Sequence, residues 1–423
     1  MKNALIYPFS AAGRVCAPPS KSAAHRLLIC SALADRETEL ILPRTNDDIE
    51  ATIRCLRALG ANIERSGGKL KVFPIQPTEV GALPELDCGE SGSTLRFLLP
   101  VAAALRGARF SGRGRLPERP MDALTGELRR HGSQIDRDRL PITVQKGLTG
   151  GVYTLPGNVS SQYFTGLLFA SVLTGGMEIR AEGELQSIDY IRMTVDAMAA
   201  FGVRIRVMDN VLFVDPGQAY RSPGRCAVEG DWSSAAFPLC LGALTGSAVL
   251  TGLLPNSAQG DKRILPLLER IGARVKAENN QVTVTAGAKL RAIEEDVSDI
   301  PDLVPVLAAV LMHAEGRSRL YHAERLRLKE SDRLETTRRM ILDLGGEAQI
   351  QGDDLIIVGK PHCPGGTVDG AGDHRIVMAA AVAAARCAGD SVIQGAGAVD
   401  KSYPDFFEDF QTLGGIAHVV DIR

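Results

Sequence analysis

The sequence predicts an α/β fold of six repeated units, each made of two helices and a small sheet of three or four strands, grouped as two globular halves. Two recurring phrases carry this prediction. One is a helix that ends at a glycine before a strand–turn–strand segment, and the other is a polar loop followed by an apolar helix. The length of 423 residues, with 45% hydrophobic and 23% charged side chains, suits a soluble protein of two or more domains.

The first phrase is clearest in residues 49–74. Ile49, Ile53 and Leu56 have the spacing of one helix face, and Gly60 suits the left-handed position that ends a helix. Gly67-Gly68 then indicates a hairpin turn between two short strands. The phrase returns about every 70 residues, with a truncated last copy. Its marker glycines are Gly60, Gly132, Gly202, Gly272, Gly345 and Gly414.

The second phrase lies between these glycines and contains a helix rich in Ala, Leu and Val. Helices that are apolar all round are buried, so each is predicted to be the inner helix of its unit, covered by the sheet and the amphipathic helix. The first residues of all six carry polar or charged groups. These are Lys21 and Ser22; Ser93 and Arg96; Ser160, Ser161 and Gln162; Asp231 and Ser233; Asp302; and Asp373, His374 and Arg375.

Two domains of three units each are expected. Residues 217–231, which are rich in Gly, Pro and Ser, are the predicted crossover between them. The predicted limits are residues 15–227 for the N-terminal domain and residues 1–14 plus 228–423 for the C-terminal domain. The leading strand, "ALIYPFS", is thereby assigned to the C-terminal half.

Composition excludes several classes of protein. A net charge of −2 argues against a nucleic-acid binder, which usually presents a basic surface. Eight cysteines without a CxxC pair indicate free, mostly buried thiols in a reducing compartment. No signal peptide or long uninterrupted apolar segment is visible. The expectation is a cytoplasmic, soluble protein without a membrane partner.

Lys21 and Arg26 stand near a predicted helix start, where the helix dipole already disfavours cations. The plain interpretation of any one start is that a Ser or Asp merely caps the helix. However, six polar starts, three of them with Lys or Arg, favour an anionic ligand held by free N–H groups and side-chain cations.

No nucleotide-binding glycine motif, HExxH metal motif or Gly-x-Ser-x-Gly nucleophile motif is present. Two carboxylates, Asp302 and Glu330, remain among a set of cations. Plainer interpretations stay open: Asp302 as a helix cap, Glu330 and Arg333 as a solvated helix pair, and His374 as a structural histidine. The cations are Lys21, Arg26, Arg96, Arg119, Lys329, Arg333, Arg375 and Lys401.

Nine motifs resemble the EPSP synthases of the enolpyruvyl transferase family, in the family's order and approximate spacing. They are "PSKSAAHR", "GESGSTLR", "ERPMDAL", "GNVSSQY", "DWSSAAF", "DIPDLVP", "LRLKESDR", "DHR" and "KSYPDFF", and they span essentially the whole chain. The resemblance implies two domains, each of three βαβαββ units in an inverted α/β barrel-like arrangement, closing over a central cleft.

The resemblance also implies the reaction. Phosphoenolpyruvate gives its enolpyruvyl (carboxyvinyl) group to the 5-hydroxyl of shikimate 3-phosphate, with release of phosphate, in the shikimate pathway to chorismate and the aromatic amino acids. The resemblance implies that the protein needs no cofactor and no metal and that it is a monomer. Lys21, Asp302 and Glu330 are the implied catalytic residues. Shikimate 3-phosphate is expected at Lys21, Ser22, Arg26, Ser160, Ser161, Gln162, Ser187, Tyr190, Asp302 and Lys329. Phosphoenolpyruvate is expected at Lys21, Gly92, Arg119, Gln162, Arg333, Arg375 and Lys401.

In these roles Asp302 is the base at the attacking hydroxyl, Glu330 the acid at the methylene carbon, and Lys21 stabilises developing charge. The chain departs from the family at Glu90, where Asn is usual, and at Ser93, where Thr is common. A carboxylate at Glu90 requires neutralisation beside an anionic substrate.

Three rival functions are weighed against this one. A sister enzyme acting on a UDP-amino sugar is expected to carry Lys-Asn where this chain has Lys21-Ser22, and a cysteine in the loop "RGRLPERPM", which has none. A non-catalytic binding module does not require Lys21, Asp302 and Glu330 together. An RNA-end-processing relative requires a basic groove, which the charge balance disfavours.

Overall fold

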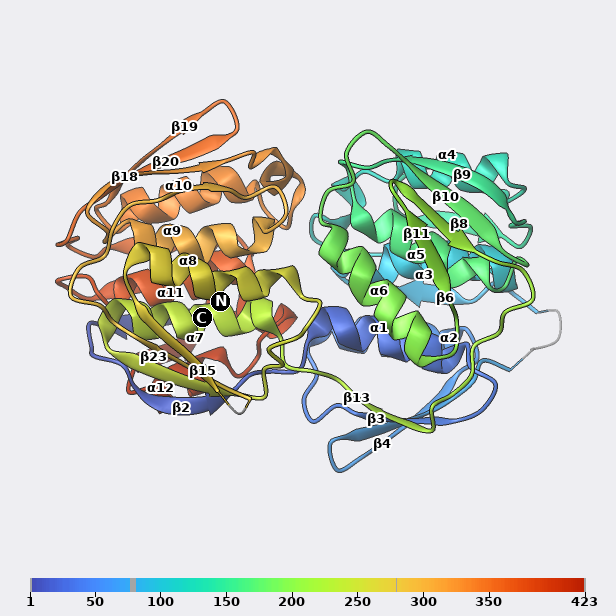
Figure 1. The fold of residues 1–423 in the computed structure, drawn as a ribbon, viewed down its shortest axis with the longest axis horizontal. Helices are drawn as coiled ribbons and strands as arrows, with labels where there is room; N and C mark the ends of the chain where they lie inside the picture. The colour runs from blue at the N-terminus through green and yellow to red at the C-terminus, as the bar shows by residue number, and fades with distance from the viewer. Residues whose placement is uncertain (1, 77–80, 279, 422–423) are drawn as a thin grey trace. The chain divides into compact units, whose positions relative to one another are not determined.

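The computed structural model describes residues 2–76, 81–278 and 280–421. The chain divides into two compact units, drawn in Figure 1: an N-terminal unit, Pro19–Val228, and a C-terminal unit, Met1–Pro18 with Glu229–Arg423. The sequence placed the first boundary at 14/15. Strand β2 (Ala12–Cys16) pairs along its whole length with β14 (Ser247–Thr251), so this part of the chain lies in the C-terminal unit.

Among the described residues, each unit contains three small sheets, and all six share one arrangement. One pair of neighbouring strands is parallel, and every further neighbour is antiparallel. This confirms the predicted fold class, a mixed α/β fold of repeated units.

The sheets of the N-terminal unit have the orders β13-β3-β5-β4, β6-β7-β8 and β11-β12-β10-β9. Their strands are β3 (Thr38–Ile41), β4 (Asn62–Ser66), β5 (Lys69–Phe73), β6 (Glu85–Asp87), β7 (Gly107–Ser111), β8 (Ile142–Gln145), β9 (Gly151–Pro156), β10 (Met177–Glu182), β11 (Ile205–Met208), β12 (Val211–Val214) and β13 (Arg225–Ala227).

The sheets of the C-terminal unit have the orders β15-β16-β14-β2, β17-β18-β20-β19 and β21-β22-β1-β23. Residue 279, between β15 and β16 in the sequence, lies outside the described residues. Besides β2 and β14, the strands are β1 (Lys2–Tyr7), β15 (Arg274–Glu278), β16 (Gln281–Thr285), β17 (Glu294–Asp296), β18 (Gly316–Tyr321), β19 (Glu347–Gln351), β20 (Asp354–Gly359), β21 (Thr367–Asp369), β22 (Ser391–Gln394) and β23 (Ile416–Asp421).

The chain passes from one unit to the other twice, after β2 and after β13. Each of these strands pairs with a repeat other than its neighbour in the sequence. β2 precedes the first helix in sequence, yet it pairs with β14 of the C-terminal unit, and β13 pairs with β3 although it leads toward the C-terminal repeats. Likewise β1 is antiparallel to both β22 and β23 and supplies the strand that the truncated last repeat lacks. The leading strand therefore pairs within the C-terminal unit.

All six marker glycines have positive φ angles, between 79° and 113°. Each follows one of the outer helices at the point where the chain must turn into the next strand, which confirms the predicted helix ends. Gly345 also needs to be small, because a Cβ there would lie 2.3 Å from Cδ of Pro364.

The second repeat departs from the prediction of a full hairpin. Only an isolated bridge, Ile135 to Val144, pairs with β8 where a strand was expected. The Oδ1 atom of Asp136 accepts from the backbone N–H of Thr143 at 2.8 Å, and Pro141 has no N–H to give. The N–H of Asp136 also donates to the carbonyl of Thr143, and that of Gln145 to the carbonyl of Gln134, so a short pairing stands here in place of a full ladder.

The helices follow the predicted inner and outer roles. The inner ones are buried along most of their length, and each unit has its own hydrophobic core around them. The inner helices are α1 (Lys21–Ala32), α3 (Gly92–Leu105), α5 (Ser161–Ser171), α7 (Trp232–Thr245), α9 (Val304–Leu311) and α11 (His374–Ala384). The outer helices are α2 (Asp47–Ala58), α4 (Asp122–Arg130), α6 (Ile188–Ala200), α8 (Ile264–Ile271), α10 (Arg333–Asp343) and α12 (Phe406–Thr412).

Candidate active site

Hydroxyl and carboxylate caps begin most of the inner helices. Ser20 accepts from the N–H of Ala23, and Ser160 from that of Gln162, each at 3.3 Å. In the C-terminal unit, Asp373 accepts from the N–H of Arg375 at 2.9 Å. The capping interpretation is therefore correct for these residues, and the cations stand beside the caps rather than replacing them.

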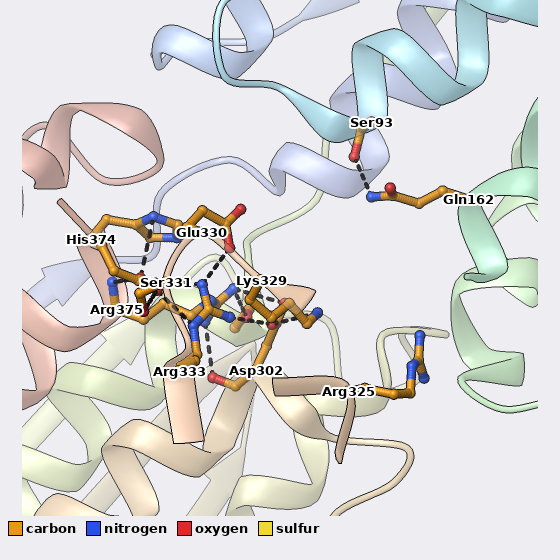
Figure 2. A network of polar contacts seen from close by, with 12 residues as sticks. Ser93, Gln162, Asp302, Arg325, Lys329, Glu330, Ser331, Arg333, His374 and Arg375 are labelled. Carbon is orange, nitrogen blue, oxygen red and sulfur yellow. Dashed lines mark hydrogen bonds and ion pairs between the residues drawn. The ribbon is translucent and has the colours of Figure 1, made fainter. Parts of the chain in front are cut away.

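Asp302 is different, because it does not cap its helix. It lies in the 3-10 helix Pro301–Leu303 that leads into α9, and three cations surround its carboxylate. Its Oδ1 atom is 3.2 Å from Nζ of Lys329 and 2.9 Å from Nη1 of Arg333, and its Oδ2 atom is 3.1 Å from Nη2 of Arg375 (Figure 2). The helix-cap interpretation of Asp302 is wrong, since its acceptors serve side chains from elsewhere in the unit.

Arg333 joins this carboxylate to two others. Its Nη2 atom is 2.6 Å from Oε2 of Glu330, and its Nε atom is 2.9 Å from Oδ2 of Asp373. The Oε1 atom of Glu330 is in turn 3.8 Å from Nζ of Lys401. The predicted Glu330–Arg333 pair is present, but Arg333 is only 1% exposed, so it is not part of a solvated helix start.

The charges in this group, which we call the carboxylate–cation cluster (Asp302, Lys329, Glu330, Arg333, Asp373, Arg375 and Lys401), shift its pKa values. Burial opposes ionisation of Asp302, but Arg375, Lys329 and Arg333 outweigh it and hold its pKa well below the usual range. Burial lowers the pKa of Lys329 to about 8, although Asp302 partly offsets it. Asp302 is therefore ionised at neutral pH, and Lys329 titrates within reach of it.

His374 lies beside this cluster and is buried. Its Nδ1 atom is 3.9 Å from Oδ1 of Asp373. That placement agrees with a structural histidine behind the cluster.

The N-terminal unit holds the other predicted residues, beginning with Lys21. Its Nζ atom is 2.9 Å from Oδ2 of the buried Asp48, in the first turn of α2. The sequence showed Asp48 only as part of an acidic helix start and did not indicate that it serves Lys21. A buried carboxylate at this distance holds the ammonium group in place at the start of α1.

Arg26 is buried, and its guanidinium ties α1 to α6. Nε donates to Oγ1 of Thr194 at 2.9 Å, and Nη2 donates to the backbone carbonyl of Tyr190 at 2.8 Å. Nη1 donates to the carbonyl of Ser22 at 2.7 Å. Burial lowers the pKa of Arg26 to about 10, so it stays charged at neutral pH. Two of the other residues predicted to bind shikimate 3-phosphate, Ser22 and Tyr190, are thus linked through this one cation.

Gln162 is oriented by two side chains of α3. Its Nε2 atom donates to Oγ of Ser93 at 3.0 Å (Figure 2). Its Oε1 atom accepts from Nη1 of Arg96 at 2.8 Å. Gly92 allows the guanidinium groups to come close, since a Cβ there would lie 2.7 Å from Nη1 of Arg119. The structure thereby brings Gly92, Arg119 and Gln162 together, as predicted for one site.

The remaining predicted residues of this unit lie at helix starts. Ser161 is buried in the first turn of α5, and Ser187 precedes α6 with a left-handed φ of 55°. The carboxyl group of Glu90 lies against Gly114, in the loop that follows β7. A Cβ added at Gly114 would be only 2.7 Å from Cδ of Glu90. Glu90 therefore has a defined place beside the Gly92 turn.

The described residues contain no group of three or more His, Cys, Asp and Glu side chains placed to hold a metal ion. Within the same residues, none of the helices is long and apolar enough to cross a membrane.

Solved enolpyruvyl transferases share the fold of this chain. The fold is shared with the enolpyruvyl transferase NikO from Streptomyces tendae, with a TM-score of 0.78 at 18% identity over 100% of this chain and 99% of that one. More narrowly, the chain belongs to the EPSP synthase (3-phosphoshikimate 1-carboxyvinyltransferase) family, whose model matches residues 8–410. The resemblance seen in the sequence is thus confirmed.

Similar proteins cover the chain almost completely. The 3-phosphoshikimate 1-carboxyvinyltransferase of Clostridium kluyveri is 39% identical over 98% of both chains, and that of Clostridium beijerinckii is 38% identical over the same shares. The structure of EPSP synthase from Acinetobacter baumannii matches with a TM-score of 0.85 at 26% identity and covers 100% of both chains. These likenesses favour this family over the three rivals considered from the sequence.

Proposed function

We propose that this chain transfers the carboxyvinyl group of phosphoenolpyruvate to the 5-hydroxyl of shikimate 3-phosphate and releases phosphate. The carboxylate–cation cluster is the observation that carries the mechanism. It places one candidate base, Asp302, and one candidate acid, Glu330, on the same buried cation, Arg333. Family membership supplies the identity of the two substrates.

Shikimate 3-phosphate brings a phosphate and a carboxylate, so it needs several cations and hydroxyl groups. In the N-terminal unit these are Lys21, already held by Asp48, and Arg26, which links Ser22 to Tyr190. From the C-terminal unit, Lys329 and Asp302 act on the same substrate. The full proposed set is Lys21, Ser22, Arg26, Ser160, Ser161, Gln162, Ser187, Tyr190, Asp302 and Lys329.

Phosphoenolpyruvate also carries a phosphate and a carboxylate, which suit guanidinium groups that bind two oxygens at once. Arg119 lies against Gly92 in the N-terminal unit, and Arg333 and Arg375 lie in the carboxylate–cation cluster. The full proposed set is Lys21, Gly92, Arg119, Gln162, Arg333, Arg375 and Lys401.

Asp302 is the proposed base. In the substrate-free chain its low pKa makes it ionised but weakly basic. When anionic substrates share the charges of Lys329, Arg333 and Arg375, the carboxylate loses part of its stabilisation and becomes more basic. The base is thus strengthened at the moment when the hydroxyl group arrives, and it removes the hydroxyl proton as the C–O bond forms.

Glu330 is the proposed acid. As the oxygen of shikimate 3-phosphate bonds to C2 of phosphoenolpyruvate, Glu330 gives a proton to C3 and the double bond becomes single. In the second step the bond from C2 to the phosphate oxygen breaks and its electron pair goes to the phosphate. A proton leaves C3 for the carboxylate of Glu330, which restores the double bond, and Asp302 gives the hydroxyl proton to the released phosphate. Lys21 stabilises the negative charge on the departing phosphate. No metal and no cofactor take part in this sequence.

Two further features are part of this proposal. The chain is expected to act as a monomer in the cytoplasm. Six of its eight cysteines are buried, with only Cys16 exposed and Cys226 half-buried, which suits a reducing compartment.

The direct test is phosphate release from purified protein given both substrates, with each omitted in turn. Release that requires both supports the transferase. If shikimate 3-phosphate binds but no phosphate is released, the chemistry assigned to the cluster is wrong. If neither substrate binds, the proposed function is overturned.

A further inference from the structure

Asp261 is a buried carboxylate that the proposed mechanism does not use. It lies in the 3-10 helix Gly260–Arg263 before α8 and is 5% exposed. The turn before it is fastened to the start of α7. Gln259 donates from Nε2 to the carbonyl of Gly230 at 2.8 Å and accepts on Oε1 from the N–H of Trp232 at 3.0 Å. The turn that leads to Asp261 is therefore fixed against the start of α7.

Ser233 connects this carboxylate to Arg375. The Ser233 hydroxyl oxygen accepts from Nη2 of Arg375 at 2.7 Å. A serine hydroxyl has one proton to donate, and a hydrogen bond with Ser233 is among the effects that lower the pKa of the Asp261 carboxyl group. Ser233 is 8% exposed, so little water competes for either bond.

Arg375 is thereby held from two sides. On one side its Nη2 atom is 3.1 Å from Oδ2 of Asp302, and its Nη1 atom donates to the backbone carbonyl of Asp302 at 3.1 Å. On the other side its Nη2 atom donates to the hydroxyl of Ser233, which connects it to Asp261. A guanidinium that is fixed this way is already oriented for an anion, which lowers the cost of ordering it on binding.

The charged groups that face Asp261 are Asp302, Arg375 and the α7 cap Asp231. Burial raises the pKa of Asp261 to about 6, and the two other carboxylates add to this effect, while Arg375 and Ser233 oppose it. An anionic substrate that shares the charge of Arg375 weakens the main stabiliser of ionised Asp261. The carboxylate then gains a proton from solvent.

We propose that Asp261 is a positioning residue: acting through Ser233, it holds the guanidinium of Arg375 for an anionic substrate, and it takes up a proton when that substrate binds. This inference rests on the proposed role of Arg375 in binding phosphoenolpyruvate. No bond to carbon is made or broken by Asp261.

Proton uptake is the measurement that separates this role from a merely structural one. The probe is inorganic phosphate, added to protein saturated with shikimate 3-phosphate at pH 6.5, because these two molecules do not react with each other. Titration calorimetry in two buffers of different ionisation enthalpy gives the number of protons taken up. The wild-type chain is expected to take up a proton fraction that Asp261→Asn lacks. The titration of phosphate itself is common to both proteins and cancels in the comparison.

Kinetics supply the second readout. Ser233→Ala cuts the connection and is expected to raise KM for phosphoenolpyruvate about 10-fold, while kcat changes less than threefold. Ser233→Thr keeps the hydroxyl group and is expected to restore KM. Asp343→Asn, at an exposed carboxylate whose pKa is also raised by its surroundings, is the control and should behave as the wild type.

Equal proton uptake in the wild type and Asp261→Asn would overturn the inference, as would an unchanged KM in Ser233→Ala. The Ser233 variants decide the matter should Asp261→Asn fail to fold. Phosphate release by the wild-type chain keeps these outcomes distinct from failure of the proposed function, which would show as no release at all.

Discussion

Asp302 and Arg333 form an ion pair of 2.9 Å in which the arginine is 1% exposed. A buried cation is costly unless it is fully paired, and Arg333 meets this condition by also binding Glu330 and Asp373. One arginine therefore fixes the candidate base and the candidate acid relative to each other. Substitutions of Asp302 or Glu330 should therefore affect the chemistry more than the binding of single substrates.

The first prediction concerns the base. Asp302→Asn keeps the size of the side chain but removes the charge that balances Lys329, Arg333 and Arg375. We expect kcat for phosphate release to fall by about 100- to 10,000-fold, the usual contribution of a general base. Steady-state assays at saturating substrate measure this directly.

Asp296→Asn is the matched control, because Asp296 pairs with the exposed His322 outside the cluster. It should retain activity within about twofold. A kcat of Asp302→Asn close to that of the control would remove Asp302 from the role of base.

The second prediction concerns the acid. Glu330→Gln keeps an acceptor for Arg333 but has no proton to give to C3. We expect turnover to fall by about 100-fold or more, with the Kd for shikimate 3-phosphate changed less than about threefold. The pH–rate profile should also lose an ionisation that the wild type shows. Glu335→Gln, at a carboxylate that pairs with Arg338 and Arg339 on the surface of α10, is the control. A profile that is the same in all three proteins would count against Glu330.

The third prediction is a loss of activity at alkaline pH through Lys329. Because burial lowers its pKa to about 8, it sheds its proton well below the ordinary value of 10.5. We expect kcat/KM for shikimate 3-phosphate, which reports ionisations of the free protein, to fall above pH 8. Lys329→Arg stays charged and should move this fall upward by at least about one pH unit.

Unfolding does not account for such a loss. The folded pKa of Lys329 lies below the unfolded one, so its burial costs stability below pH 8, and this cost is relieved as the pH rises toward 10.5. Thermal unfolding between pH 7.5 and 9.5 checks this point. An alkaline limb that is identical in the wild type and Lys329→Arg would assign it to another group.

The repeats and the inner helices could be predicted because their signals are local. A glycine that ends a helix and a helix that is apolar all round show in a few neighbouring residues, and Gly60 and α11 behave as expected. The pairing of β2 with β14 could not be predicted, since strand partners more than 230 residues apart leave no local trace. The irregular bridge at Ile135 was likewise hidden in a segment that reads as a hairpin.

The candidate site could also be predicted only in part from the sequence. Lys21 and Arg375 stood out because cations are unusual at helix starts. Two supporting carboxylates did not stand out. Asp48, which pairs with Lys21, and Asp261, which reaches Arg375 through Ser233, lie in segments that look like ordinary acidic helix starts. What binds a buried cation depends on which helices pack together, and that is decided by the three-dimensional structure.

The last prediction tests the glycine that ends the fifth outer helix. Gly345 and Gly352 both have positive φ angles, 83° and 64°, so alanine at either position carries the backbone strain of the left-handed region, about 1 kcal/mol. Only at Gly345 would the added Cβ meet another atom, Cδ of Pro364 at 2.3 Å, whereas nothing lies within 4 Å at Gly352. Overpacking of that kind costs a further ~1–3 kcal/mol.

Gly345→Ala should therefore unfold at lower urea concentration than Gly352→Ala, with a free energy of unfolding lower by about 1–3 kcal/mol. Gly352→Ala controls for backbone strain alone, so the difference between the two isolates the contact with Pro364. Equal midpoints would mean that the loop at Pro364 moves aside at little cost. The close approach of helix end and loop would then not be what requires glycine at this point of the repeat.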